Sequence, residues 1–154
     1  MLYCLIYNLN SSSGRKSKFI NRVLSKLKEN NSVDYFETKT INQAKKIFKD
    51  FNQKNYDRLI VAGGDGSVSF AINELIKNDF NFKDDFALGY IPAGTANLLQ
   101  AELSMNKKVD DIVNVLVSNN YKSSNLVKIN ENYFFLMAGI GSVSYTHLTL
   151  PTKA

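Results

Sequence analysis

A chain of 154 residues is long enough to bury a hydrophobic core and is expected to form one main domain. Its 44% hydrophobic and 21% charged residues exclude a disordered protein, and no apolar run approaches the roughly 20 residues of a membrane span. The net charge of +5 gathers partly within residues 15–28. This segment is either a solvated helix face or a surface for anionic phosphates and acidic bilayers.

The single cysteine, Cys4, cannot form an intrachain disulfide, and its place in an apolar segment predicts a buried thiol. The first residues lack the basic region and cleavage site of a secretory signal peptide. Both features predict a cytoplasmic location, and the basic segment adds peripheral contact with the inner face of the membrane. Nucleic acid is not expected as a partner, because no RNA- or DNA-binding motif is present. The sequence leaves a homodimer open.

In chain order, short apolar strands alternate with amphipathic helices. Strands are expected at residues 2–7, 33–36, 57–62 and 86–91, and helices at 19–27, 41–51, 68–76, 95–103 and 109–116. Two further strands, 126–129 and 133–138, flank a hairpin-like turn. This order predicts an α/β fold: a doubly wound, mostly parallel sheet with helices on both faces.

Ligands of such sheets bind beyond the carboxyl ends of the strands. The segments that follow the first, third and fourth predicted strands are rich in Gly, Ser, Asn and Thr, and they comprise residues 10–14, 63–67 and 92–97. We therefore expect the functional site at this edge of the sheet.

The segment Gly63–Ser67 is the most informative of the three. Its glycines allow a sharp turn whose backbone N–H groups can hold an anion, and Ser67 is expected either to cap the following helix or to bind phosphate. A plain strand-to-helix turn would need the glycines only for shape. Asp65 argues against that, since a carboxylate beside phosphates must bind a cation or accept a proton. The P-loop pattern is missing, and Gly64-x-Gly66 is a poor dinucleotide fingerprint.

Ala62–Ser67 resembles the Gly-Gly-Asp-Gly-Thr/Ser motif shared by diacylglycerol and sphingosine kinases, NAD kinases and phosphofructokinases. Residues 89–97 resemble the Pro-x-Gly-Thr-x-Asn segment of the lipid kinases among these. Asn10–Gly14 is similar to their Asn-Pro-x-Ser-Gly loop, with Ser11 in place of proline, and residues 133–141 are similar to the strand that opens their second domain. The chain thus resembles a lipid kinase of the diacylglycerol kinase type.

The resemblance implies transfer of the γ-phosphoryl group of ATP, with Mg²⁺, to the hydroxyl of diacylglycerol or a related lipid at a membrane surface. Asp65 would be the catalytic carboxylate and metal ligand, and Thr95 would open a helix whose N-terminus faces phosphate. The nucleotide-binding residues would be Asn10, Ser13, Gly14, Thr38, Gly63, Gly64, Asp65, Gly66, Ser67, Thr95 and Asn97. An NAD kinase-like or phosphofructokinase-like enzyme and a non-catalytic nucleotide-binding module remain alternatives.

The chain departs from the family pattern in two places. The motif usually continues with x-Asn-Glu, whereas Ser69 and Phe70 stand here, and Asn73 and Glu74 are expected on an exposed helix face. Past Gly141 the resemblance ends, which predicts a nucleotide-binding domain at 1–122, the start of a β-rich domain at 123–141, and a non-native tail at 142–154 that contains the only histidine. Because the family's general base lies in the second domain, a truncated chain is expected to lack kinase activity.

Overall fold

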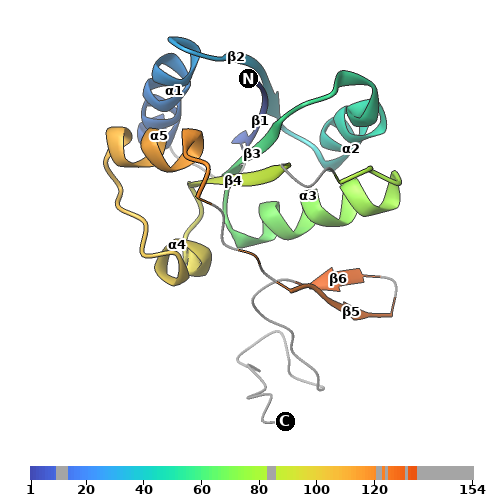
Figure 1. Ribbon diagram of the computed structural model, residues 1–154. Helices are drawn as coiled ribbons and strands as arrows, with labels where there is room; N and C mark the ends of the chain where they lie inside the picture. Colours follow the sequence, from blue (N-terminus) through green and yellow to red (C-terminus); the bar gives the residue numbers. More distant parts are fainter. Residues whose placement is uncertain (10–13, 83–85, 121–122, 124, 131, 135–154) are drawn as a thin grey trace. The chain divides into compact units, whose positions relative to one another are not determined.

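The computed structural model describes residues 1–154 except 10–13, 83–85, 121–122, 124, 131 and 135–154 (Figure 1). The chain divides into two compact units, Met1–Tyr121 and Lys122–Ala154. In the described part of the chain, no helix is both long and apolar enough to cross a membrane.

The first unit alternates strands and helices as the sequence predicts. Its elements are β1 (Leu2–Asn8), α1 (Gly14–Lys28), β2 (Ser32–Thr38), α2 (Ile41–Lys49), the 3₁₀ helix η2 (Phe51–Lys54), β3 (Arg58–Gly63), α3 (Asp65–Lys77), β4 (Ala87–Pro92), α4 (Leu98–Glu102) and α5 (Val109–Val117).

The four strands form one parallel sheet in the order β2-β1-β3-β4. In its register Leu5 lies opposite Tyr35 on one side and Ile60 on the other. Because all four strands run the same way, the segments that follow them emerge at one edge. The predicted α/β fold with a parallel sheet is confirmed.

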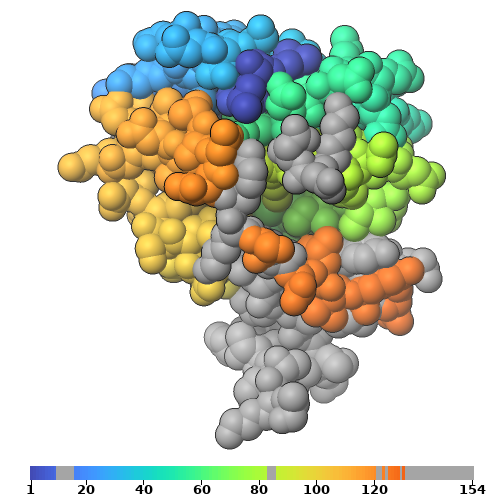
Figure 2. All heavy atoms as spheres, viewed as in Figure 1, coloured from blue at the N-terminus to red at the C-terminus, as the bar shows by residue number. Residues whose placement is uncertain are grey.

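Helices cover both faces of this sheet: α1 and α5 lie on one face, and α2 and α3 on the other (Figure 1). In the space-filling view the atoms of α1, in blue, and of α5, in orange, meet in one continuous surface (Figure 2). Alternate strand residues point to opposite faces. Tyr3, Leu5 and Tyr7 accordingly join the core beneath α1 and α5.

Aromatic side chains fill much of the opposite layer. Phe51 stacks on Phe48 at a centroid distance of 6.0 Å and meets Tyr56 at 4.9 Å. Phe70 of α3 packs edge-on against Phe48, also at 6.0 Å. These contacts fix α2 and α3 against each other and so define the space between them.

Two predicted helices are shorter than expected. The helix expected to reach residue 51 stops at Lys49, and the chain turns into η2, which ends at Asn55 with a left-handed φ of 50°. The helix expected from Thr95 begins only at Leu98, because Asn97 also adopts a left-handed φ of 50°. A residue in that conformation interrupts a right-handed helix.

The second unit contains a short antiparallel hairpin, β5 (Val127–Ile129) and β6 (Asn132–Phe134). Asn130, with a φ of 54°, lies in the predicted turn between them. Residues 135–138 of the predicted last strand and the tail at 142–154 lie outside the described residues.

Candidate functional site

The carboxyl edge of the sheet brings the predicted segments 63–67 and 92–97 together. β1 ends at Asn8, β2 at Thr38, β3 at Gly63 and β4 at Pro92, all at this edge. The glycine-rich turn after β3 therefore lies beside the Pro-Ala-Gly turn after β4. Gly63 shows this directly, since its carbonyl oxygen accepts hydrogen bonds from the N–H groups of Ala93, at 2.8 Å, and Gly94, at 3.0 Å.

The glycine-rich turn passes straight into α3. Gly64 is the residue that caps the helix, with extended backbone, and its carbonyl accepts the N–H of Ser67 at 2.9 Å. The prediction that Ser67 caps the helix is wrong; it lies within the first turn and lines a cavity. A Cβ added to Gly66 would meet no heavy atom within 4 Å, so this backbone borders open space. The turn thus offers a helix N-terminus and unobstructed backbone, as anion sites require.

Asn97 closes the turn after β4 with three hydrogen bonds. Its Oδ1 accepts the N–H of Gly94 at 2.9 Å and the hydroxyl of Tyr90 at 3.0 Å, and its Nδ2 donates to the Gly94 carbonyl at 3.0 Å. Burial of Tyr90, assisted by the charge of Asp65, raises the pKa of the phenol well above its usual range. The phenol therefore stays protonated and can donate to Asn97. Asn97 is engaged in shaping its own turn.

Asp65, the first residue of α3, reaches across to α4. Its two carboxylate oxygens accept the N–H groups of Leu98 at 2.9 Å and Leu99 at 3.0 Å. The expectation that Thr95 opens a helix facing phosphate is wrong on this point, because α4 begins at Leu98 and its first N–H groups are occupied by Asp65. Thr95 instead lies exposed in the turn that precedes the helix.

Lys16 joins a further element to the same turn. From the start of α1 its Nζ donates to the carbonyls of Ala93 at 2.8 Å and Gly94 at 3.0 Å. The interpretation of the basic segment as a solvated helix face is therefore wrong for Lys16, which is half-buried. Lys18, Arg22 and Lys28 are exposed as that interpretation expects.

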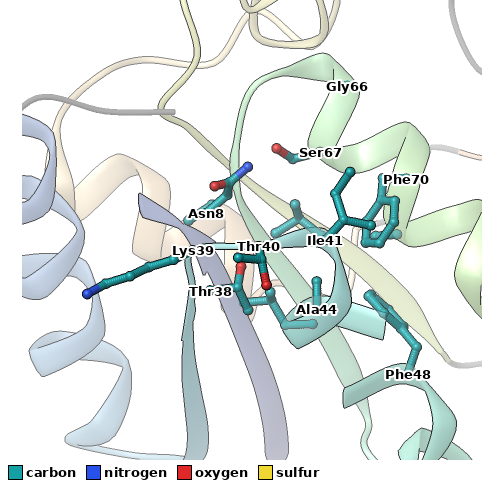
Figure 3. A pocket seen from close by; sticks show the side chains of 14 residues that line it. Asn8, Thr38, Lys39, Thr40, Ile41, Ala44, Phe48, Gly66, Ser67 and Phe70 are labelled. Atoms are coloured by element: carbon teal, nitrogen blue, oxygen red, sulfur yellow. The ribbon is translucent and has the colours of Figure 1, made fainter. Parts of the chain in front are cut away.

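A cavity of about 270 Å³ opens between α2 and α3 at the carboxyl ends of β1, β2 and β3 (Figure 3). One end is polar: Asn8 and Ser67 point toward each other from β1 and α3, with Thr38 and Thr40 below them (Figure 3). The other end is apolar and is walled by Ile41, Ala44, Phe48, Phe70 and Ala71. Thr38 is buried and donates its hydroxyl hydrogen to the Tyr7 carbonyl at 3.3 Å. The cavity therefore combines an apolar wall with a small group of polar side chains, as ligand-binding pockets commonly do.

The predicted site residues fall into distinct groups. Gly63, Gly64, Asp65, Gly66, Ser67, Thr95 and Asn97 lie on the two adjacent turns, whereas Asn10 and Ser13 lie outside the described residues. Gly14 begins α1, and Thr38 lines the cavity beside Ser67. In the described residues no group of three or more Asp, Glu, His or Cys side chains could hold a metal ion. Residues 63–67 and 92–97 contain a single carboxylate, that of Asp65.

Several contributors were not predicted from the sequence. Lys16 resembled any other charge on a helix, because its partner Ala93 is distant in the chain. Tyr90 resembled any other aromatic residue of a strand, because its bond to Asn97 depends on how the intervening turn folds. Phe70 stands where the family motif has a polar residue, and it forms part of the apolar wall. Glu74, expected to be exposed, is only 6% exposed, so that expectation is wrong.

Comparison of the sequence with known proteins shows which family the chain resembles. Residues 3–129 match the family described as "Diacylglycerol kinase catalytic domain". A Streptococcus pneumoniae protein provisionally named as a lipid kinase is 31% identical over 121 residues, which cover 75% of this chain and 40% of that protein. A Staphylococcus saprophyticus protein named diacylglycerol kinase is 27% identical over 150 residues, 97% of this chain and 48% of that protein.

Comparison with a solved structure supports the fold of the chain and says nothing about its function. The crystal structure of a diacylglycerol kinase from Bacillus anthracis str. Sterne superimposes with a TM-score of 0.70 at 24% identity. The match covers 86% of this chain and 45% of that one. The chain therefore spans less than half the length of each of the proteins to which it is compared here.

Proposed function

Because the chain belongs to the diacylglycerol kinase catalytic domain family, we propose that it forms the nucleotide-binding part of an ATP-dependent lipid kinase. In the proposed reaction the hydroxyl oxygen of diacylglycerol or a related lipid attacks the γ-phosphorus of ATP. ADP leaves, and the hydroxyl proton passes to a base. Such an acceptor resides in a membrane, so the protein would work in the cytoplasm at the inner membrane surface.

The cavity beside the glycine-rich turn carries this proposal. Its apolar end, which Ile41, Phe48 and Phe70 line, is suited to a purine base, and its polar end lies at the N-terminus of α3. Backbone N–H groups and the helix dipole at such an N-terminus favour phosphate. A base in the apolar end would thus direct its phosphates toward Gly66 and Ser67.

The remaining predicted residues have proposed places around the phosphates. Gly63 and Gly64 shape the turn, and Thr95 offers a hydroxyl and an N–H from the neighbouring turn. Asn10, Ser13 and Gly14 are further proposed phosphate contacts, and Asn10 and Ser13 lie outside the described residues. Thr38 lies at the cavity's polar end, and Asn97 contributes by holding the Thr95 turn in place.

Asp65 is the proposed carboxylate for Mg²⁺. The ion typically takes only one or two protein carboxylates and draws its other ligands from phosphates and water, so a lone Asp65 fits it. Bound with ATP, Mg²⁺ neutralises charge that develops on the phosphate oxygens. The N–H groups of Leu98 and Leu99 hold the carboxylate in a fixed orientation, and each oxygen keeps a lone pair for a further partner.

Since the chain spans less than half the length of each relative compared, we propose that nucleotide binding and turnover are separable. The 154 residues would bind ATP without transferring phosphate by themselves. Phosphoryl transfer depends on positioning both substrates together, and the site proposed on the described residues is for the nucleotide.

Calorimetric titration with ATP, ADP, NAD⁺ and fructose 6-phosphate tests the first part of the proposal. We expect saturable binding of ATP and ADP only, and binding of NAD⁺ without ATP would overturn the proposed nucleotide site.

A fusion protein tests the proposed lipid phosphorylation. Residues 1–134 would be joined to the remaining half of the Staphylococcus saprophyticus relative and assayed with diacylglycerol micelles. Lipid phosphorylation that Asp65→Ala abolishes supports the kinase. A folded fusion that binds ATP but phosphorylates no lipid favours a non-catalytic nucleotide-binding module.

A further inference from the structure

Lys16 connects two segments of the site that are far apart in the sequence. It lies in the first turn of α1, directly after the segment that follows β1, and its ammonium group donates to the carbonyls of Ala93 and Gly94 at 2.8 and 3.0 Å. Hydrogen bonds from a charged donor are about twice as strong as neutral ones, and partial burial shields this pair from water. The ammonium group therefore holds the turn after β4 at a fixed place.

Fixing these carbonyls also fixes the opposite sides of their peptide groups. A trans peptide is planar, so its C=O and N–H point in opposite directions. The Gly94 carbonyl is held from two sides, by Lys16 and by the Nδ2 of Asn97 at 3.0 Å. The N–H of Thr95 belongs to the same peptide group, so Lys16 sets the direction in which Thr95 presents it.

The basic side chains of α1 that the structure describes beyond Lys16 do not share this arrangement. Lys18 and Arg22 are exposed, and Lys26 pairs with Asp110 of α5. Among the described basic side chains of this helix, Lys16 is thus the one that hydrogen-bonds to the turn between β4 and α4. Exposed charges on the same helix serve as internal controls.

We propose that Lys16 is a positioning residue for phosphate binding: by holding the Ala93 and Gly94 carbonyls, it aims the Thr95 N–H at the nucleotide phosphates. This inference rests on the proposed nucleotide site. Lys16 acts through the turn, so its removal should weaken ligands that carry phosphates and leave a nucleoside unaffected.

The test compares Lys16→Met, Lys16→Arg and the control Lys18→Met in the 154-residue chain. ATP, ADP and adenosine affinities would be measured by calorimetry. Lys16→Met removes both charge-assisted hydrogen bonds, of which the one to Gly94 holds the peptide group of Thr95. Loss of that bond predicts roughly tenfold weaker ATP and ADP binding. Adenosine binding should not change, Lys16→Arg should recover part of the loss, and Lys18→Met should match the wild type. In the free protein, the Thr95 amide resonance should shift in Lys16→Met and stay in place in Lys18→Met.

Different failures have different meanings. A Lys16→Met protein that is folded and binds ATP as the wild type does, with an unshifted Thr95 amide, overturns the inference but leaves the proposed function standing. An equal loss of ATP and adenosine affinity also overturns it, because the role would then be general stability. A wild-type chain that binds no nucleotide removes the proposed function, and the inference falls with it.

Discussion

Gly94 lies against Gly64 so closely that a Cβ built on Gly94 would stand 2.4 Å from the Gly64 Cα. The same Cβ would stand 2.8 Å from the Oδ1 of Asn97. One glycine belongs to the turn after β3 and the other to the turn after β4, so the two turns meet backbone to backbone. Their separation, and hence the width of the candidate phosphate site, is set by the absence of a side chain.

The substitution Gly94→Ala is therefore expected to force the turns apart. Because the obstructing atom is backbone, no side chain can move aside, and the cost should resemble overpacking, at about 1–3 kcal/mol of unfolding free energy. Urea unfolding measures that loss, and calorimetry should show weaker ATP binding. A Gly94→Ala protein as stable as the wild type would contradict the close approach.

Gly66→Ala is the control substitution for Gly94→Ala, because it adds the same methyl group to the turn after β3 at a position with space for it. A Cβ at Gly66 meets no protein atom within 4 Å, and alanine favours a helix by up to about 1 kcal/mol over glycine. Stability should therefore stay constant or rise. ATP affinity should fall, because the methyl group enters the space proposed for phosphates. Unchanged affinity would place the phosphates elsewhere.

The sheet could be predicted from the sequence because its strands are short apolar runs with helical segments between them. The turns could also be predicted, since glycine, serine and threonine cluster where strands end. The start of α4 could not: it depends on the left-handed Asn97, which is held by Tyr90 and Gly94. Such side-chain hydrogen bonds within a turn leave no periodic pattern in the sequence.

The cavity escaped prediction for a related reason. Its apolar wall comes from Phe48 and Phe70, which the sequence places on two separate predicted helices. Only the strand order β2-β1-β3-β4 brings α2 and α3 together on one face. Predicted helix faces fix which side chains point inward, but not which helices are neighbours.

Asp65→Asn separates the two roles proposed for this residue. An asparagine can accept only one of the N–H groups of Leu98 and Leu99 through its oxygen, and its amide hydrogens face the other. By analogy with a lost helix cap, stability should fall by about 1–2 kcal/mol, and α4 amides should exchange faster.

The metal role of Asp65 makes a second prediction. The enhancement of ATP affinity by Mg²⁺ should shrink in Asp65→Asn, and the exposed control Asp79→Asn should retain it. If the α4 amides of Asp65→Asn exchange faster but Mg²⁺ enhances its ATP affinity as in the wild type, Asp65 has a structural role and does not bind the metal.

Cys4 predicts a pH dependence. Burial, with a smaller contribution from the charge of Asp34, raises the pKa of this thiol well above its ordinary value. The folded state therefore keeps a proton that the unfolded state loses above about pH 8.5, so stability is complete below that pH and falls as pH rises.

The stability difference attributable to Cys4 can be isolated with Cys4→Ala. This variant should be less stable at pH 7 because a buried side chain is truncated. Between pH 8.5 and 10 its unfolding free energy should fall less steeply than that of the wild type. The two slopes should differ by about 1.4 kcal/mol per pH unit at most. Parallel pH curves for the two proteins would contradict burial of an un-ionised thiol.

The location of bound nucleotide tests the central claim most directly. Amide resonances of the 154-residue chain would be followed during titration with ATP and Mg²⁺. The account predicts that the largest shifts fall on Thr38, Gly66, Ser67 and Thr95, with aromatic shifts at Phe48 and Phe70. Saturable ATP binding that leaves these residues unmoved and shifts a different part of the chain would contradict it.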